Sequence, residues 1–172
     1  GGGCFSQSGA AMLFDRGALV VVKNNEATSE NGGGLYLEDV GSSLTVSGNG
    51  TQLSVENNTA GLRGGGCFSQ SGAAMLFDRG AMVVVKNNEA VSENGGGLFL
   101  KDVGSSLDVS GNGTQLSVEN NTAGLHGGGW ESSAGAAVLL SEGAVTIVGN
   151  NKAMNKGGGG IFVAHSSLFS AK

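Results

Sequence analysis

The sequence predicts an all-β fold: a right-handed parallel β-helix (solenoid) with three short strands per 31–32-residue coil and about five and a half coils. Three observations lead to this fold. Glycine triplets recur at nearly constant intervals. Three segments of alternating apolar and polar residues lie between successive triplets. β-Branched residues are frequent, and the i, i+3, i+4 spacing of apolar residues in helices is missing. Because crossover connections between parallel strands are right-handed, the coil should be right-handed too.

The repeat has two levels. Residues 1–63 return as residues 64–126 with only six changes, and within each block the glycine triplets divide the chain every 31 or 32 residues. Since the chain lacks a starting methionine and begins and stops within a repeat, we expect a single β-helix segment of a longer repeat protein. The triplets place the coils at residues 1–31, 32–63, 64–94, 95–126, 127–157 and 158–172.

The alternation within each segment predicts which side chains point inward. In the coil at 32–63 the first segment is GGGLYLEDV, the second SSLTVSG and the third QLSVENNTA. Inward positions of the second and third are Leu44, Val46, Leu53 and Val55. All six differences between the two long blocks fall on outward or turn positions, which supports this phase. The inward residue of the first segment is, coil by coil, Cys4, Leu35, Cys67, Leu98, Trp130 or Ile161.

An asparagine pair follows the third segment of every complete coil. Stacked amides bond to each other and to turn backbone, and asparagine tolerates the left-handed conformation that a sharp corner needs. We therefore expect one asparagine of each pair to turn inward and form a structural ladder. The pairs are Asn24-Asn25, Asn57-Asn58, Asn87-Asn88, Asn120-Asn121 and Asn150-Asn151.

The glycine triplets should mark the next corner. A turn with positive φ explains one or two glycines, and tight packing between coils explains the third. A phosphate-binding loop needs a helix amino terminus and a lysine or hydroxyl at set spacing. Neither occurs here, and the triplet recurs six times.

The sequence then resembles a known family of repeats. GGGLYL at 32–37 followed by VENNTA at 55–60 is similar to the GGA[ILV] and FxxN motifs of chlamydial-type polymorphic outer-membrane proteins. Valine takes the phenylalanine place, and the third glycine replaces alanine. The resemblance covers essentially the whole chain. It implies a right-handed parallel β-helix and a secreted or surface-exposed role in adhesion or surface architecture.

Composition and charge exclude several functions. The net charge of −5 is spread out and no basic run occurs, which disfavours nucleic acid as a partner. No apolar run approaches the roughly 20 residues of a membrane span. The acids Asp15, Asp78, Glu26 and Glu89 recur every second coil, about 10 Å apart, as a ladder rather than a constellation of unlike groups. We expect no catalytic residues, metal or cofactor, and hence no enzyme.

The two cysteines, Cys4 and Cys67, occupy the same position two coils apart. Their Cα atoms should lie nearly 10 Å apart, whereas a disulfide needs less than about 7 Å. The sequence therefore predicts two free, buried thiols that pack as small hydrophobes.

The predicted outward positions carry much apolar area. Either loops or flanking domains cover it, or it packs laterally against other chains, and the second is favoured. An aromatic row could instead stack on sugar rings. The candidate face, interrupted by Glu131, comprises Phe5, Tyr36, Phe68, Phe99, Phe162, Leu13, Leu76, Leu139, Leu19, Val21, Met82 and Val84.

Four Asn-x-Thr sequons add a possible modification. Asn49 and Asn112 lie in an NGT turn and are plausible glycan sites in a secreted protein. Asn57 and Asn120 belong to the asparagine pairs and should be less accessible. The functional expectation is a self-associating structural segment of a secreted or cell-surface filament, sheath or adhesin. Its partners would be copies of itself and flanking repeats. The alternative is a carbohydrate-binding or carbohydrate-cleaving β-helix.

Overall fold

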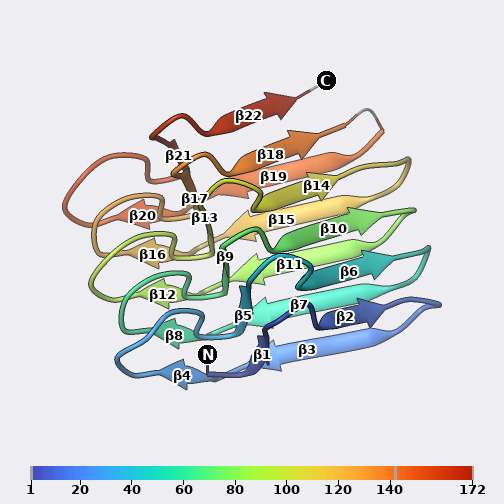
Figure 1. Cartoon of the computed structure of the whole chain (residues 1–172), viewed down its shortest axis with the longest axis horizontal. Coiled ribbons are helices and arrows are strands. Elements are labelled where there is room, and N and C mark those ends of the chain that lie inside the picture. Colours follow the sequence, from blue (N-terminus) through green and yellow to red (C-terminus); the bar gives the residue numbers. More distant parts are fainter. Residues whose placement is uncertain (1, 142, 172) are drawn as a thin grey trace.

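The computed structural model describes residues 2–141 and 143–171, and they form a parallel β-solenoid of about five turns, each about 31 residues long (Figure 1). Every strand pairs in parallel with the equivalent strands of adjacent coils, so the predicted fold class is confirmed. Among the described residues no helix is long and apolar enough to cross a membrane.

Four sheets run along the solenoid. Sheet A contains β1 (Cys4–Ser6), β5 (Leu35–Glu38), β9 (Cys67–Gln70), β13 (Leu98–Lys101), β17 (Trp130–Ser133) and β21 (Ile161–Val163). Sheet B contains β2 (Ala11–Phe14), β6 (Ser43–Ser47), β10 (Ala74–Asp78), β14 (Ser106–Val109), β18 (Ala137–Leu140) and β22 (Leu168–Ala171). Sheet C contains β3 (Leu19–Lys23), β7 (Gln52–Glu56), β11 (Met82–Lys86), β15 (Gln115–Glu119) and β19 (Val145–Gly149).

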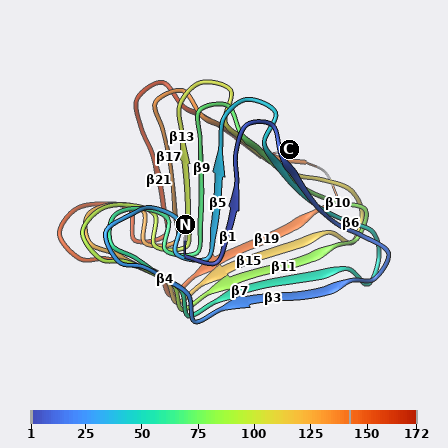
Figure 2. The same ribbon diagram turned by 60° about the horizontal axis from the view of Figure 1, so that its bottom comes forward.

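Sheet D is a fourth element beside the three predicted strands. Its strands are only two residues long, namely β4 (Glu26–Ala27), β8 (Thr59–Ala60), β12 (Glu89–Ala90), β16 (Thr122–Ala123) and β20 (Lys152–Ala153). Each follows the asparagine corner, and its alanine is buried in all but the fifth coil. A loop then leaves the body of the solenoid and returns through the glycine triplet to sheet A (Figure 2).

The predicted inward residues form the core. Leu44, Val46, Leu53 and Val55 are fully buried, and their equivalents pair with them rung by rung. Met12, Phe14 and Val20 in the first coil are only partly buried because a neighbouring coil packs on one side alone. Sheet A contributes a second inward position that was not predicted, occupied by Leu37 and Leu100.

Successive coils differ in a way that makes the 63-residue block the structural repeat. The hydroxyl of Ser42 accepts a hydrogen bond from the Gly9 amide at 3.1 Å, and that of Thr51 accepts one from Gly17 at 3.0 Å. The next pair of coils repeats both bonds, from Gly72 to Ser105 and from Gly80 to Thr114. Even-numbered coils therefore supply buried hydroxyls to turn amides of odd-numbered coils, which satisfies donors that the corners would otherwise leave unpaired.

Candidate functional site: the outer face of sheet C

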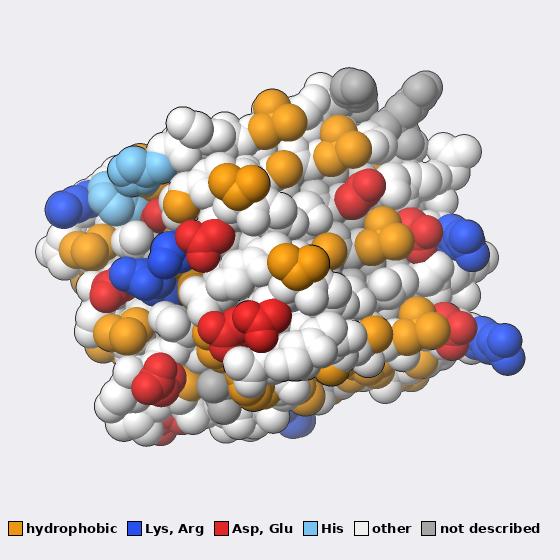
Figure 3. Space-filling view, in the orientation of Figure 1, with side chains coloured by type: hydrophobic (Ala, Val, Ile, Leu, Met, Phe, Trp, Pro, Cys, Tyr) orange, Lys and Arg blue, Asp and Glu red, His pale blue; other side chains and the backbone are white. Residues whose placement is uncertain are grey.

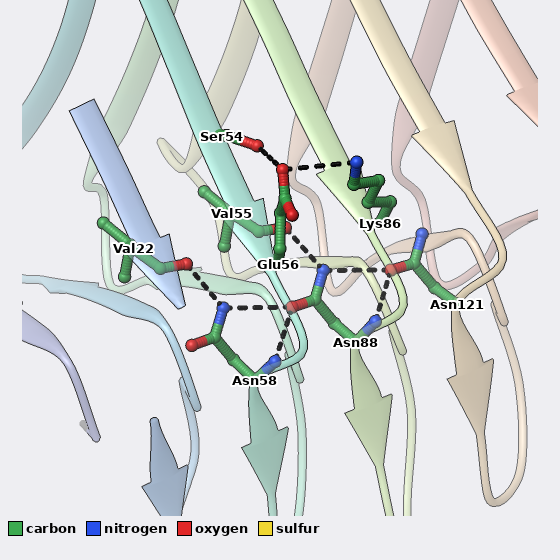
Figure 4. A network of polar contacts seen from close by, with 8 residues as sticks. All are labelled: Val22, Ser54, Val55, Glu56, Asn58, Lys86, Asn88 and Asn121. Atoms are coloured by element: carbon green, nitrogen blue, oxygen red, sulfur yellow. Dashed lines mark hydrogen bonds and ion pairs between the residues drawn. The ribbon is translucent and has the colours of Figure 1, made fainter. Parts of the chain in front are cut away.

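The asparagine ladder supports one end of sheet C (Figure 4). Asn88 Nδ2 donates to the Val55 carbonyl at 2.9 Å and to Asn121 Oδ1 at 3.0 Å. Its Oδ1 accepts from the backbone and side-chain amides of Asn58, at 3.0 and 3.1 Å. The same pattern joins Asn25, Asn58, Asn88, Asn121 and Asn151, which confirms that one asparagine of each pair turns inward.

The other asparagine of each pair is not part of the ladder. Asn24, Asn57, Asn87, Asn120 and Asn150 are exposed and have φ between 53° and 57°, the left-handed region that asparagine tolerates. The expectation that Asn57 and Asn120 are less accessible is therefore wrong, because only their neighbours turn inward. Asn49 and Asn112 are also exposed, so all four sequons lie at the surface.

The outer face of sheet C, whose strands lie side by side in Figure 2, carries side chains that alternate between apolar and polar from one coil to the next. Leu19 and Val21 of the first coil are 72% and 59% exposed. The third coil places Met82 and Val84 in register with them, and the fifth places Val145 and Ile147 there. The even coils between carry Gln52, Ser54, Gln115 and Ser117. The face therefore has apolar ridges about 10 Å apart, separated by rows with a small serine at their centre.

A depression of about 350 Å³ lies between the first two ridges. Its walls are Leu19 and Val21 on one side and Met82 and Val84 on the other, and Ser54 lies in the polar row between them. We call this depression the Ser54 groove. Since Ser117 takes the place of Ser54 between the next two ridges, the arrangement repeats with the 63-residue block.

Charges of alternating sign border the same face. In register along the end of sheet C lie Lys23, Glu56, Lys86 and Glu119. Lys86 Nζ is 3.3 Å from Glu56 Oε1, and the Ser54 hydroxyl donates to the same carboxylate (Figure 4). The Ser54 hydrogen bond and the Lys86 ammonium hold the pKa of Glu56 below its usual value. The first two ridges thus end in lysine and the two grooves in glutamate, while the third ridge ends in Gly149.

Sheet B offers less exposed apolar surface. Leu13 and Leu139 are exposed and Leu76 is half-buried, while Thr45 and Asp108 separate them in register. In Figure 3 the hydrophobic side chains on the visible face are dispersed among polar surface and charged groups. The predicted interaction residues on sheets B and C are therefore at the surface, with the larger apolar rows on sheet C.

The aromatic row on sheet A requires a correction. Phe5, Tyr36, Phe68 and Phe99 stack in sequence, with ring centroids 4.8, 5.1 and 5.3 Å apart. Phe68 and Phe99 are 0% and 2% exposed, so they are not an open interaction face. Residues of the loops that precede the glycine triplets lie against this side of sheet A.

Contacts from these loops show how they cover the rings. The Arg63 guanidinium lies over the Phe99 ring, 5.8 Å from its centroid, and His126 stacks on Phe162 at 4.3 Å. The aromatic residues thus form a second, smaller apolar layer outside the main core. Phe5, in the first coil, remains 51% exposed.

Glu131 interrupts this layer and is buried within it. It pairs in register with Phe99 and Phe162, and it is 3% exposed. Asn94 Nδ2 donates to its Oε1 at 3.3 Å, while Oε2 has no hydrogen-bond partner among the residues that the structure describes. Burial raises the pKa of Glu131 to about 7, against the opposing influence of Ser133 and Arg63. Compared with the unfolded chain, the folded protein therefore keeps this carboxyl protonated to a higher pH.

A pH-dependent stability follows. Because the folded-state pKa of about 7 exceeds the ordinary value of 4.5, stability from Glu131 is complete below about pH 4.5 and is lost as the pH rises through 7. Glu131→Gln should therefore be more stable than the wild type at pH 8, by about 1–3 kcal/mol, and this advantage should shrink towards pH 5. Denaturant unfolding of both proteins across this range measures it. An advantage that is constant with pH would contradict the assignment.

The cysteines are free, as predicted, but only one is buried. Cys4 and Cys67 both pair with Leu35 in sheet A, so they lie two rungs apart. Cys67 is 1% exposed, and burial raises the pKa of its thiol to about 12. Cys4 is exposed, and within the described residues its strand pairs with β5 alone. The prediction of a buried thiol is wrong for Cys4.

Thiol labelling should separate the two cysteines. In the native protein Cys4 should react with iodoacetamide at the rate of an exposed thiol, and Cys67 at least about 100-fold more slowly, because it reacts only after opening of the core. Peptide mapping by mass spectrometry after timed quenching measures both rates. In denaturant the rates should converge, and equal rates in the native state would contradict the burial of Cys67.

The acidic residues keep the ladder arrangement expected from the sequence. Asp15 and Asp78 are each next to an arginine, with N–O distances of 3.6 Å to Arg16 and 3.5 Å to Arg79. Glu26 and Glu89 lie two rungs apart on either side of Thr59. Within residues 2–141 and 143–171 no group of three or more His, Cys, Asp or Glu side chains is placed to hold a metal ion.

The fold and this face define the chain as a parallel β-solenoid with one regularly ridged apolar surface. Comparison with protein-family models, with curated proteins and with solved structures finds no match.

Proposed function

We propose that this chain is a self-associating structural segment of a secreted or cell-surface filament, sheath or adhesin. The observation that carries the proposal is the outer face of sheet C, where Leu19, Val21, Val145 and Ile147 are more than half exposed in register. Apolar rows of this regularity are unusual on a surface that faces only water, and such exposed apolar surface marks interaction sites.

Two further features support a structural role at the cell surface. The buried polar side chains bond within the solenoid itself: the asparagines form the ladder, and the hydroxyls accept hydrogen bonds from turn amides. The GGGLYL and VENNTA motifs are similar to those of polymorphic outer-membrane protein repeats of the chlamydial type. That similarity supports a surface location and an adhesive or architectural role.

Self-association of the chain tests the proposal. We expect the weight-average mass in light scattering to rise with concentration above 16.9 kDa, and we expect electron micrographs of the native assembly to show laterally packed solenoids. A strict monomer at all concentrations, together with native material that contains no laterally associated solenoids, would overturn it.

A carbohydrate ligand is the second candidate. The aromatic row that suggested it is largely covered, but the Ser54 groove combines apolar walls with the polar Gln52 and Ser54, a mixture that suits a sugar. A glycan array, followed by an activity screen on any sugar that binds, tests this candidate. Binding that is lost in Val84→Lys while the fold is retained would favour it over self-association.

A further inference from the structure

We propose that sheet C is a self-complementary docking surface, on which the apolar ridges of one copy enter the serine-centred grooves of a second copy. This inference rests on the proposed self-association and specifies its geometry. It follows from one property of the repeat: ridges and grooves come from alternate coils of the same 63-residue block. Ridges and grooves therefore have the same spacing of about 10 Å, so the surface fits a copy of itself.

A twofold axis parallel to the strands produces this fit. Such an axis reverses the order of the coils but keeps the strands of both copies running in the same direction. When the axis lies between the second and third coils, β7 of one copy faces β11 of the other, and β3 faces β15. Val84 then lies over the partner copy's Ser54 groove, and Val21 lies over the equivalent groove at Ser117. Both contacts occur twice, as an isologous interface requires.

The charges select this orientation. With strands running in the same direction, the lysine that ends each ridge lies over the glutamate that ends the opposing groove. Lys86 faces Glu56 and Lys23 faces Glu119 of the second copy, in addition to the pairing within each copy. With strands running in opposite directions, the lysines would lie over Gln52 and Gln115. Complementary charges fix the relative position of two surfaces more than they add affinity. The row of alternating lysines and glutamates therefore favours the arrangement in which the strands of both copies run in the same direction.

The area of the face sets the expected strength. Five-residue strands are about 17 Å long and four rungs span about 19 Å, so the footprint is roughly 300–400 Å² on each copy. This is below the ~800 Å² per partner of a standard stable interface. The chain should therefore associate weakly, at high micromolar concentration, and the association should strengthen with every further 63-residue block in an array.

Filling the groove provides the decisive experiment. Ser54→Leu adds apolar surface to sheet C but removes the space that Val84 of the second copy would enter. A nonspecific apolar contact should become stronger in this variant, whereas ridge-in-groove docking should become at least about tenfold weaker. Sedimentation equilibrium of the 172-residue chain between about 10 μM and about 1 mM covers the range that an interface of this size needs.

Thr45→Leu is the matched control. Thr45 is the middle residue of β6 in the same coil, on the outer face of sheet B. Like Ser54→Leu, it places a leucine at the middle outward position of a strand, but away from the docking surface, so it should leave association unchanged. Circular dichroism and thermal unfolding establish that both variants keep the wild-type fold.

A charge exchange tests the orientation. In the variant with Lys23→Glu, Glu56→Lys, Lys86→Glu and Glu119→Lys, the alternation is kept within each copy, so folding and self-association should be retained. A mixed pair with the wild type would place like charges opposite each other, and should be at least about tenfold weaker than either homodimer. Fluorescence measurements on separately labelled proteins report the mixed pair.

The outcomes separate the inference from the proposed function. Association that Ser54→Leu leaves unchanged or strengthens would overturn ridge-in-groove docking, while self-association itself would stand. Free mixing of the exchanged and wild-type proteins would overturn the orientation. A chain that stays monomeric to about 1 mM would contradict the inference. Imaging of the native assembly would then test the proposed function separately.

Discussion

Asn88→Ala is expected to lower the free energy of unfolding by about 3–6 kcal/mol, the largest effect that we predict for a polar side chain. The side chain makes four hydrogen bonds inside a corner where Asn88 is 1% exposed. Alanine leaves the Val55 carbonyl and both amides of Asn58 without these partners. Each buried group that loses its partner costs about 1–3 kcal/mol. Urea denaturation followed by circular dichroism measures the loss.

Asn87→Gly is the matched control for this substitution. Asn87 precedes Asn88 in the chain, is exposed, and has φ of 55°. Glycine adopts this conformation without a steric penalty, so the variant should stay within about 0.5 kcal/mol of the wild type. If both variants lost a similar amount of stability, the corner would depend on the turn residues in general, and the inward amide would have no special role.

Gly65→Ala is expected to destabilise the solenoid by about 3 kcal/mol or more, although it adds a single methyl group. A Cβ atom at this position would lie 2.4 Å from the Glu89 carbonyl carbon and 2.5 Å from the Gly96 carbonyl oxygen. Both are backbone atoms, so the clash is relieved only by moving a rung of the solenoid. Overpacking of a rigid core costs about 1–3 kcal/mol, and more where the backbone is displaced. For a chain of this size we expect the Tm to fall by at least about 6 °C.

Gly157→Ala tests whether the position, rather than glycine content, matters. Gly157 directly precedes the last triplet, and a Cβ there would have no atom within 4 Å. Its replacement should be neutral or slightly stabilising, since alanine reduces the entropy of the unfolded chain. A Gly65→Ala variant as stable as Gly157→Ala would contradict the close packing of the triplet against sheet D. Calorimetry of the two variants makes the comparison direct.

The triplets show how much of a corner can be predicted from sequence. A positive φ was expected for one or two glycines, and it occurs at the first glycine of every triplet from Gly32 onward, such as Gly64 with φ of 64°. The second and third are needed for space. Gly65 lies against the backbone beside sheet D, and a Cβ at Gly66 would lie 3.0 Å from the ladder amide of Asn88. Sheet D was not predicted, because two residues are too few for an alternation to be recognised.

The coil length, the three main strands, the inward faces of the second and third strands and the inward turn of one asparagine in each pair could be predicted from the sequence, because these follow from periodicity. Each 31–32-residue coil alternates apolar and polar residues, so the apolar side chains of successive coils stack on one another in only one register. The 63-residue duplication also determined that apolar and polar rows alternate outside sheet C, since coils of two kinds follow one another.

Which outward side chains meet water could not be predicted from the sequence. Phe68 and Met82 lie in the same coil and both point away from the core in their strands, yet Phe68 is 0% and Met82 is 39% exposed. The difference comes from the loops before the glycine triplets, whose Arg63 and His126 lie against aromatic rings of sheet A, whereas the ridges of sheet C are exposed. Alternation specifies the side of a strand on which a residue lies, but what packs against that side depends on the path of a loop with no period of its own.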